Sequence, residues 1–316
     1  MSRDQKIKIA MVICAVIVLC AVIITSTGWF SSSGIGGYAN AEKYTAGATE
    51  LKEGIKNLNV NWTSGKVIIA YHAENTVALQ ETAKRSLSED EQMHWWLDGD
   101  TLRVQYAKAG IRWNMPEKTL TITLPEGMEL DKAGIQTTSG DMEIPSLKAE
   151  KLELGSTSGS IDAAAEAEKI AAASTSGDVK IRLTSDADSI SLGSTSGSLS
   201  LEAGTLKSIS AGSTSGGISI TVKECKDVSA GSTSGNIQVS LGSFEKLAAG
   251  ATSGSITAKL PGEPGFTVKV DQTSGSFSSD LALTKNGNTY TCGDGSAKAE
   301  IGTTSGSIRI EAAEAK

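Results

Sequence analysis

The chain has 316 residues, a formal net charge of −7 and an aromatic content of 4%. This mild acidity, without a stripe of Lys and Arg, argues against nucleic acid as a partner. All five Trp residues lie before residue 114. We therefore expect an N-terminal part built differently from a C-terminal part whose core is small and aliphatic.

The first predicted element is a membrane anchor over residues 9–30, which is just long enough to span a bilayer. Arg3, Lys6 and Lys8 precede it, so the positive-inside rule places the tail 1–8 in the cytoplasm. A cleaved signal peptide is the alternative, but no small-x-small cleavage site follows the apolar run. The expected localisation is the cell membrane, single-pass, with the anchor in lipid and the repeats extracytoplasmic.

Two further segments precede the repeats. Residues 31–49 are rich in Gly, Ser and Ala, which is typical of a flexible linker. Residues 50–135 are predicted to form an N-terminal β cap and the first rungs. Within this cap, Ser88 and Glu91 have the spacing of a capping box and favour a short helix. Asp98 and Gly99 mark a hairpin turn.

The motif Thr-Ser-Gly then recurs at steps of 18 to 20 residues from Thr138 to Thr252, with wider steps to Thr273 and Thr304. A fixed period near twenty residues is typical of stacked repeats. Apolar residues alternate on both sides of each Ser-Gly break, which predicts strand, corner and strand. Residues 136–311 are therefore predicted to form a parallel β-solenoid (β-helix) of ~19-residue rungs, with a hairpin insertion at 281–298. The predicted fold class is all-β, preceded by one transmembrane helix.

Glycine is expected at each corner because it adopts positive φ without steric cost. The predicted structural corner glycines are Gly140, Gly159, Gly177, Gly197, Gly216, Gly235, Gly254, Gly275 and Gly306. Ser and Thr hydroxyls would stabilise the bend, and equivalent Thr residues would stack into a ladder. This ladder is either a regular binding face, as in ice-binding solenoids, or corner chemistry alone. The second is favoured, because only one Thr per rung recurs.

Few residues are candidates for a site. His94, Trp95 and Trp96 are candidate ligand contacts, with packing of the cap as the favoured alternative. No pattern marks a catalytic Ser, and we predict no catalytic residue, cofactor or metal site. Cys225 and Cys292 fall in rungs roughly 14 Å apart at the usual strand spacing. A disulfide needs Cα atoms within about 7 Å, so both are predicted to be unpaired thiols.

The sequence resembles the bacterial putative-adhesin β-strand-repeat family, a domain family of unknown function. The similarity covers about residues 50–311 and is carried by the segments 58–69, 99–104, 120–125, 293–295 and 301–310, together with the serial Thr-Ser-Gly corners. The resemblance implies a surface-exposed β-solenoid, often on a membrane anchor. It implies no established chemistry and no active-site residues.

These observations lead to two hypotheses for function. The first is a non-enzymatic, membrane-anchored, outward-facing solenoid that acts as an adhesin-like binding protein or as a structural protein of the envelope. Its partner would be an envelope polymer or a host surface. The alternative is an accessory or sensor subunit of an envelope-stress signalling complex, which would need a membrane-protein partner because the tail 1–8 is too short for an output domain. A carbohydrate-active enzyme is a third, less favoured interpretation.

Overall fold

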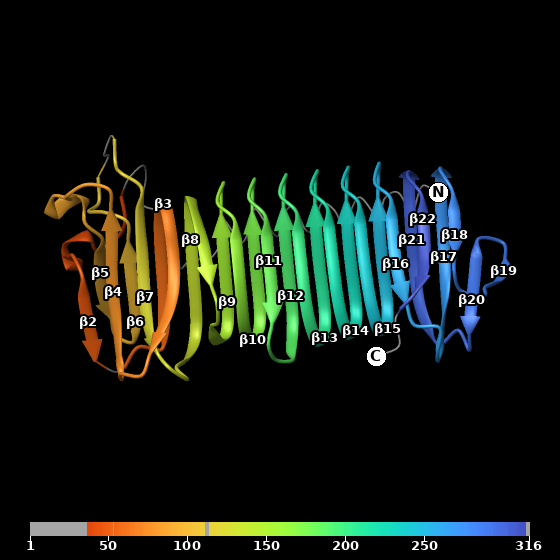
Figure 1. The fold of residues 1–316 in the computed structure, drawn as a ribbon, viewed down its shortest axis with the longest axis horizontal. Helices are drawn as coiled ribbons and strands as arrows, with labels where there is room; N and C mark the ends of the chain where they lie inside the picture. The colour runs from red at the N-terminus through yellow and green to blue at the C-terminus, as the bar shows by residue number, and fades with distance from the viewer. Residues whose placement is uncertain (1–36, 53, 111–113, 314–316) are drawn as a thin grey trace. The chain divides into compact units, whose positions relative to one another are not determined.

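A computed structural model describes residues 37–52, 54–110 and 114–313, which fall into two compact units. The N-terminal unit comprises residues 37–177 and the C-terminal unit residues 178–313. Strands dominate both units, as Figure 1 shows. The only helices among the described residues are two three-residue 3-10 turns, η1 (Ala41–Lys43) and η2 (Glu89–Glu91). The all-β prediction is therefore confirmed for the described chain.

The N-terminal unit contains ten strands, most of which have alternating buried and exposed residues. They are β1 (Thr45–Ala46), β2 (Thr49–Lys52), β3 (Asn57–His72), β4 (Thr76–Ala83), β5 (His94–Asp98), β6 (Thr101–Gln105), β7 (Lys118–Pro125), β8 (Glu129–Ile144), β9 (Lys148–Ser156) and β10 (Ile161–Ser174). Residues 41–46, inside the predicted linker, form η1 and β1, and β1 pairs with β5.

Each rung of the N-terminal unit has a first half and a second half. The strands of each half pair with those of the same half in the neighbouring rungs. The first halves run in the order β1, β5, β6, β3, β8, β9 and β10, and the second halves in the order β2, β4, β7, β3, β8 and β10. Contacts from β6 and β7 onward are parallel, whereas β1, β5, β2 and β4 pair antiparallel. The antiparallel strands thus cover the open side of the first parallel rung.

The C-terminal unit contains twelve strands. They are β11 (Val179–Leu183), β12 (Ala187–Ser194), β13 (Leu199–Ser213), β14 (Ile218–Ser232), β15 (Ile237–Ala251), β16 (Ile256–Leu260), β17 (Gly265–Ser274), β18 (Phe277–Ser279), β19 (Thr284–Asn286), β20 (Thr289–Gly293), β21 (Ala297–Ser305) and β22 (Ile308–Ala312). From β12 to β16 the strands pair in parallel with an offset of 19 residues, as in Leu199 opposite Ile218 and Ile218 opposite Ile237. The predicted solenoid register is confirmed.

The order of the last rungs differs from their order in the sequence. β15 and β16 pair with β21 and β22, and only then do β17 and β18 follow. The outer rung of β17 and β18 therefore precedes β21 and β22 in the sequence, although β21 and β22 lie between it and β15 and β16. β20 and β19 continue antiparallel from β17 and cover its outer side.

The core of each unit is aliphatic and narrow. Inward positions alternate along each strand, for example Ile209 and Ala211 in β13, which are 2% and 0% exposed. Equivalent residues of neighbouring rungs stack on one another, since Ile209 lies opposite Val228 and Ala211 opposite Ala230. Each rung therefore buries an apolar edge that it could not bury alone.

The prediction of a transmembrane helix and of a single-pass membrane localisation requires correction. The segment 9–30 lies outside the described residues. Within the described ranges, no helix is long and apolar enough to cross a membrane, since η1 and η2 have three residues each. The described residues therefore form an all-β fold. An apolar run of the right length does not by itself establish a spanning helix.

Candidate functional site

The three candidate ligand contacts, His94, Trp95 and Trp96, are consecutive on β5. Successive side chains of a strand point to opposite faces, so Trp96 shares a face with His94 and Trp95 lies on the other. His94 is 5% exposed, and its Nδ1 lies 2.9 Å from the carbonyl oxygen of Gln92. The three side chains therefore do not form one pocket.

Trp96 is half-buried and packs against cationic and aromatic neighbours. Its ring centroid lies 5.7 Å from that of Tyr44, 4.7 Å from Nζ of Lys43 and 5.9 Å from the guanidinium carbon of Arg103. Arg103 also donates a hydrogen bond from Nε to Asp98 at 3.1 Å. Cation–π contacts of this kind stabilise a ring in place. The packing interpretation of Trp96 accounts for these contacts without a ligand.

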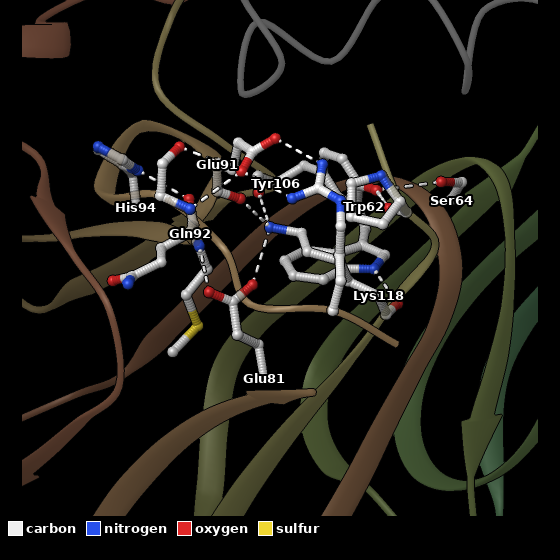
Figure 2. Close-up of polar contacts among 12 residues, drawn as sticks. Trp62, Ser64, Glu81, Glu91, Gln92, His94, Tyr106 and Lys118 are labelled. Atoms are coloured by element: carbon white, nitrogen blue, oxygen red, sulfur yellow. Dashed lines mark hydrogen bonds and ion pairs between the residues drawn. The ribbon is translucent and has the colours of Figure 1, made fainter. Parts of the chain in front are cut away.

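A buried polar network surrounds Lys118 on β7, a residue that no sequence motif marks. Its side chain is 0% exposed, and its Nζ forms an ion pair at 2.8 Å with Oε2 of Glu81 on β4. The same Nζ donates to the carbonyl oxygen of Glu91 at 2.7 Å and to that of Tyr106. Figure 2 shows the ammonium group between these acceptors.

Two aromatic rings complete this Lys118 site, which we define as Trp62, Glu81, Tyr106, Lys118 and the backbone of Glu91. The rings of Trp62 and Tyr106 meet edge to face with centroids 4.9 Å apart. Nζ of Lys118 lies 5.0 Å and 4.3 Å from these centroids. Trp62 donates from Nε1 to the carbonyl oxygen of Lys118 at 3.0 Å.

The charges of the Lys118 site are set by its surroundings. Burial lowers the pKa of Lys118 from its ordinary value, against the opposing effect of the Glu81 carboxylate. Glu91 forms two hydrogen bonds with Arg85, at 2.9 and 2.6 Å, and these hold the pKa of Glu91 at about 2. The capping box of Ser88 and Glu91 is present, as predicted, and shapes η2. Because the site is closed to solvent, its role is to hold β4, β6, β7 and η2 together.

The repeated corners rest on a buried Ser rather than on the Thr-Ser pair. At five corners the Ser that precedes the Thr accepts a hydrogen bond from the corner Gly N–H, for example Gly216 to Ser213 at 2.8 Å and Gly235 to Ser232 at 2.7 Å. Ser213 and Ser232 are both 0% exposed. Ala251 takes the place of this Ser before Thr252. The prediction that a hydroxyl bonds the backbone at the bend is met by this buried Ser.

The corner glycines are required for a different reason from the predicted one. Of the nine, only Gly275 has a positive φ, at 120°, so the expected left-handed backbone is wrong for the others. A Cβ added to Gly216 would lie 1.9 Å from the carbonyl oxygen of Gly197, and one added to Gly235 would lie 2.0 Å from that of Gly216. Glycine is needed because neighbouring corners stack backbone on backbone.

We expect Ser213→Ala to lower the free energy of unfolding by about 1–3 kcal/mol, because the buried N–H of Gly216 loses its acceptor. The matched control is Ser215→Ala, which changes an exposed hydroxyl of the same corner and should stay within about 0.5 kcal/mol. Thermal and urea unfolding followed by circular dichroism measure both. Equal stability of the two variants would remove the structural role given to Ser213.

An exposed hydroxyl ladder remains once the buried Ser explains the corner. In five successive rungs of the C-terminal unit it consists of the Thr-Ser pairs 195–196, 214–215, 233–234, 252–253 and 304–305, whose Ser residues are exposed and whose Thr residues are exposed or half-buried. Among the described residues, no side-chain hydrogen bond at the corners uses these Thr hydroxyls. Backbone bonds hold the pairs in register, such as Ser215 N–H to the Thr195 carbonyl at 2.9 Å and Ser234 N–H to that of Thr214 at 2.9 Å.

The remaining candidates for chemistry are few. Cys225 and Cys292 are buried and free, as predicted, and burial raises the pKa of Cys225 to about 11. Buried thiols of high pKa are poor nucleophiles. In the described part of the chain, no group of three or more His, Cys, Asp or Glu side chains could hold a metal ion.

These features define a class of protein, a parallel β-solenoid with glycine-stacked corners and antiparallel end strands. The chain belongs to the Toastrack DUF4097 family, whose pattern it matches over residues 55–311. This match confirms the predicted resemblance to an adhesin-like domain family of unknown function. A comparison with curated proteins finds none that matches the chain.

Several solved structures are similar to this chain. A putative adhesin from Bacteroides fragilis NCTC 9343 is 17% identical with a TM-score of 0.43, and the match covers 83% of this chain and 95% of that chain. A putative lipid binding protein from Parabacteroides distasonis ATCC 8503 is 16% identical with a TM-score of 0.45, covering 84% and 96%. A putative adhesin from Parabacteroides merdae ATCC 43184 is 13% identical with a TM-score of 0.41, covering 84% and 96%. Similarity at this level assigns no function to this chain.

Proposed function

We propose that this protein is a non-enzymatic, adhesin-like binding protein whose contact surface is the exposed hydroxyl ladder. The partner would be a neutral, hydroxyl-rich polysaccharide lying along the stacked corners. One observation carries the proposal. The corner is built by the stacked Gly and, in three of these five rungs, by the buried Ser194, Ser213 or Ser232. The Thr-Ser pairs themselves are exposed or half-buried, and their side chains form no hydrogen bond that holds the described corners.

The charge of the ladder favours this class of partner. The residues that follow the corner glycines in these five rungs, Ser198, Gly217, Asn236, Ser255 and Ser307, are also uncharged. A polyanion would need Lys or Arg at the contact surface, whereas sugar hydroxyls can exchange hydrogen bonds with Thr and Ser hydroxyls. Strand pairing keeps successive rungs about 4.8 Å apart, so the ladder offers the same hydroxyls at regular intervals to an extended chain.

The ladder also favours binding over cleavage. Glycoside hydrolysis uses a pair of carboxyl groups that flank the scissile bond. The ladder positions carry Thr and Ser rather than Asp or Glu. The alternative of a sensor subunit depended on the segments 1–8 and 9–30, which lie outside the described residues.

The test replaces four hydroxyls of the ladder at once by Thr195→Val, Thr214→Val, Thr233→Val and Thr252→Val. The full chain is mixed with insoluble neutral polysaccharides (a β-glucan, chitin and a mannan), and bound protein is measured by cosedimentation. We expect the wild-type protein to bind at least one of them and the ladder variant to bind it at least about tenfold more weakly. Four lost hydrogen bonds of about 0.5 kcal/mol each exceed the 1.4 kcal/mol that tenfold requires.

The matched control carries Thr205→Val, Thr221→Val and Ser243→Ala, which remove exposed hydroxyls away from the corners. Its binding should equal that of the wild type, and both variants should melt like the wild type. The proposal fails when the wild type binds no member of the panel. It also fails when the ladder variant binds as tightly as the control.

A further inference from the structure

One rung of the C-terminal unit is inserted between two rungs that precede it in the sequence. This inserted rung is formed by β21 and β22 (residues 297–312). It pairs in parallel with β15 and β16 on one side and with β17 and β18 on the other. Figure 1 shows this order of the strands. We call the space that the inserted rung fills the slot, and the two neighbouring rungs its walls.

The two walls of the slot are in register with each other. Leu247 of β15 and Val268 of β17 both lie opposite Ala299, and residues 256 and 277 share a partner in β22 in the same way. The two wall residues differ by 21 in number in each case, on both sides of the corner. If the inserted rung left, the walls would therefore stack on each other with apolar positions facing apolar positions. The slot would close instead of exposing two apolar edges.

The inserted rung is held by contacts that a second copy can also supply. Ile301, Ile308 and Ile310 are 1%, 0% and 0% exposed. The Oγ1 of Thr303 donates a hydrogen bond to the carbonyl oxygen of Gly254 in one wall, at 2.9 Å. Because every copy carries the same rung and the same slot, a rung from a second copy makes all of these contacts. Exchange of an identical element is a low-cost route to a dimer.

A link of only three residues, 294–296, joins β20 to the inserted rung. β20 and β21 pair with opposite sides of β17, so the link crosses the end of that strand. The N–H of Asp294 donates to the carbonyl oxygen of Pro264 at 3.0 Å, and Gly295 has a φ of 69°. Short, tightly turned links favour exchange between copies, because an extended link no longer has to make the turn.

We propose that the inserted rung is exchanged between two copies of this chain, so that β21 and β22 of each copy fill the slot of the other. The partner is a second copy, and the contact surface is the slot. The matched register of the walls lowers the cost of opening, and the short link favours the extended product. The proposal does not depend on the proposed function, since an exchanged rung supplies the same Thr-Ser pair to the hydroxyl ladder.

The first test co-expresses two full-length copies under different affinity tags, one with Ala248→Cys and one with Glu300→Cys. Residues 248 and 300 are exposed and lie opposite each other on β15 and β21. Paired strands are about 4.8 Å apart, and a disulfide needs Cα atoms within about 7 Å. The two new cysteines therefore meet when the rung of one copy lies in the slot of the other. After mild oxidation, we expect peptide mass spectrometry to find a disulfide between residues 248 and 300 of different copies.

The matched control combines Ala248→Cys in one copy with Ser229→Cys in the other. Residue 229 lies opposite residue 248 on its other side, in β14, which is not part of the inserted rung. These two cysteines should stay unlinked between copies. The proposal is overturned when the 248–300 disulfide is no more abundant than the disulfide of this control.

The second test changes the link. Gly295→Val disfavours the tight turn, because it places a β-branched residue at positive φ and a Cβ 2.8 Å from the Oγ1 of Thr267. We expect the dimer fraction, measured by size-exclusion chromatography with light scattering, to rise at least about threefold. Gly287→Val is the matched control, since Gly287 has a φ of 64° in the turn between β19 and β20 and no atom within 4 Å of an added Cβ. It should leave the dimer fraction unchanged, and equal dimer fractions in the two variants would also overturn the proposal.

Discussion

Gly216→Ala is expected to destabilise the C-terminal unit by about 3 kcal/mol, the upper part of the usual range for overpacking. The added Cβ would lie 1.9 Å from the carbonyl oxygen of Gly197 and 2.5 Å from its carbon, and both are backbone atoms. The neighbouring corner can relieve this clash only by moving away. That movement would stretch rung-to-rung bonds such as Ser215 N–H to the Thr195 carbonyl, now 2.9 Å.

Gly217→Ala is the matched control for this substitution. Its added Cβ would find the carbonyl oxygen of Asn236 at 3.6 Å as its nearest neighbour, which is an ordinary contact. We expect a change within about 0.5 kcal/mol in the free energy of unfolding, measured by urea unfolding of both variants in parallel. If alanine is tolerated equally at both positions, close stacking does not explain the corner glycines.

Lys118→Met is expected to destabilise the N-terminal unit by about 3–5 kcal/mol, the usual cost of breaking a buried ion pair from one side. The substitution leaves the Glu81 carboxylate, 7% exposed, without its cation. It also removes the donor to the carbonyl oxygens of Glu91 and Tyr106. Urea unfolding followed by Trp fluorescence measures the loss, since Trp62 lies beside Lys118.

Two comparisons isolate the role of charge at this site. Lys66→Met removes the exposed partner of Glu143 and should cost at most about 1 kcal/mol, because the side chains of that pair are 36% and 51% exposed. The double variant Lys118→Met with Glu81→Leu should recover most of the stability, since no unpaired buried charge remains. A Lys118→Met protein as stable as Lys66→Met would contradict the structural role of the Lys118 site.

The difference in stability between the wild type and Lys118→Met should change with pH in a definite direction. Burial lowers the pKa of Lys118 in the folded protein below its ordinary 10.5. Between the lowered pKa and 10.5, the unfolded chain binds more protons at this residue than the folded one. The free energy of unfolding of the wild type should therefore rise with pH across this window relative to Lys118→Met.

The corner glycines show what a sequence pattern can predict and what it cannot. The recurrence of glycine from Gly140 to Gly254 at steps of 18 to 20 residues identified the corner glycines and the stacked fold. Its physical explanation was wrong, because positive φ and close backbone stacking both select glycine and leave the same pattern. The φ angles of the corner glycines and the 1.9 Å distance at Gly216 separate the two causes. Ser213 likewise belongs to the repeated sequence pattern. The pattern did not show that its buried hydroxyl accepts the hydrogen bond of the Gly216 N–H.

The candidate site was less accessible to sequence reasoning. His94, Trp95 and Trp96 stand together in the sequence, but the alternation of a strand separates Trp95 from the other two. Lys118 has no motif around it, and its partners come from β4, from η2 and from Tyr106, the residue after β6. Residues so far apart in sequence meet only through strand pairing, which a local pattern does not contain.

By itself, the sequence determined the stacked parallel architecture of this protein, because a 19-residue offset of apolar positions can be buried in only one register. The tertiary structure alone decided that β21 and β22 lie inside β17 and β18. It also decided that Lys118 is enclosed by aromatic rings. The physical reason is that rungs with equivalent corners have nearly equal local preferences. Their order and their ends are therefore set by contacts between distant segments.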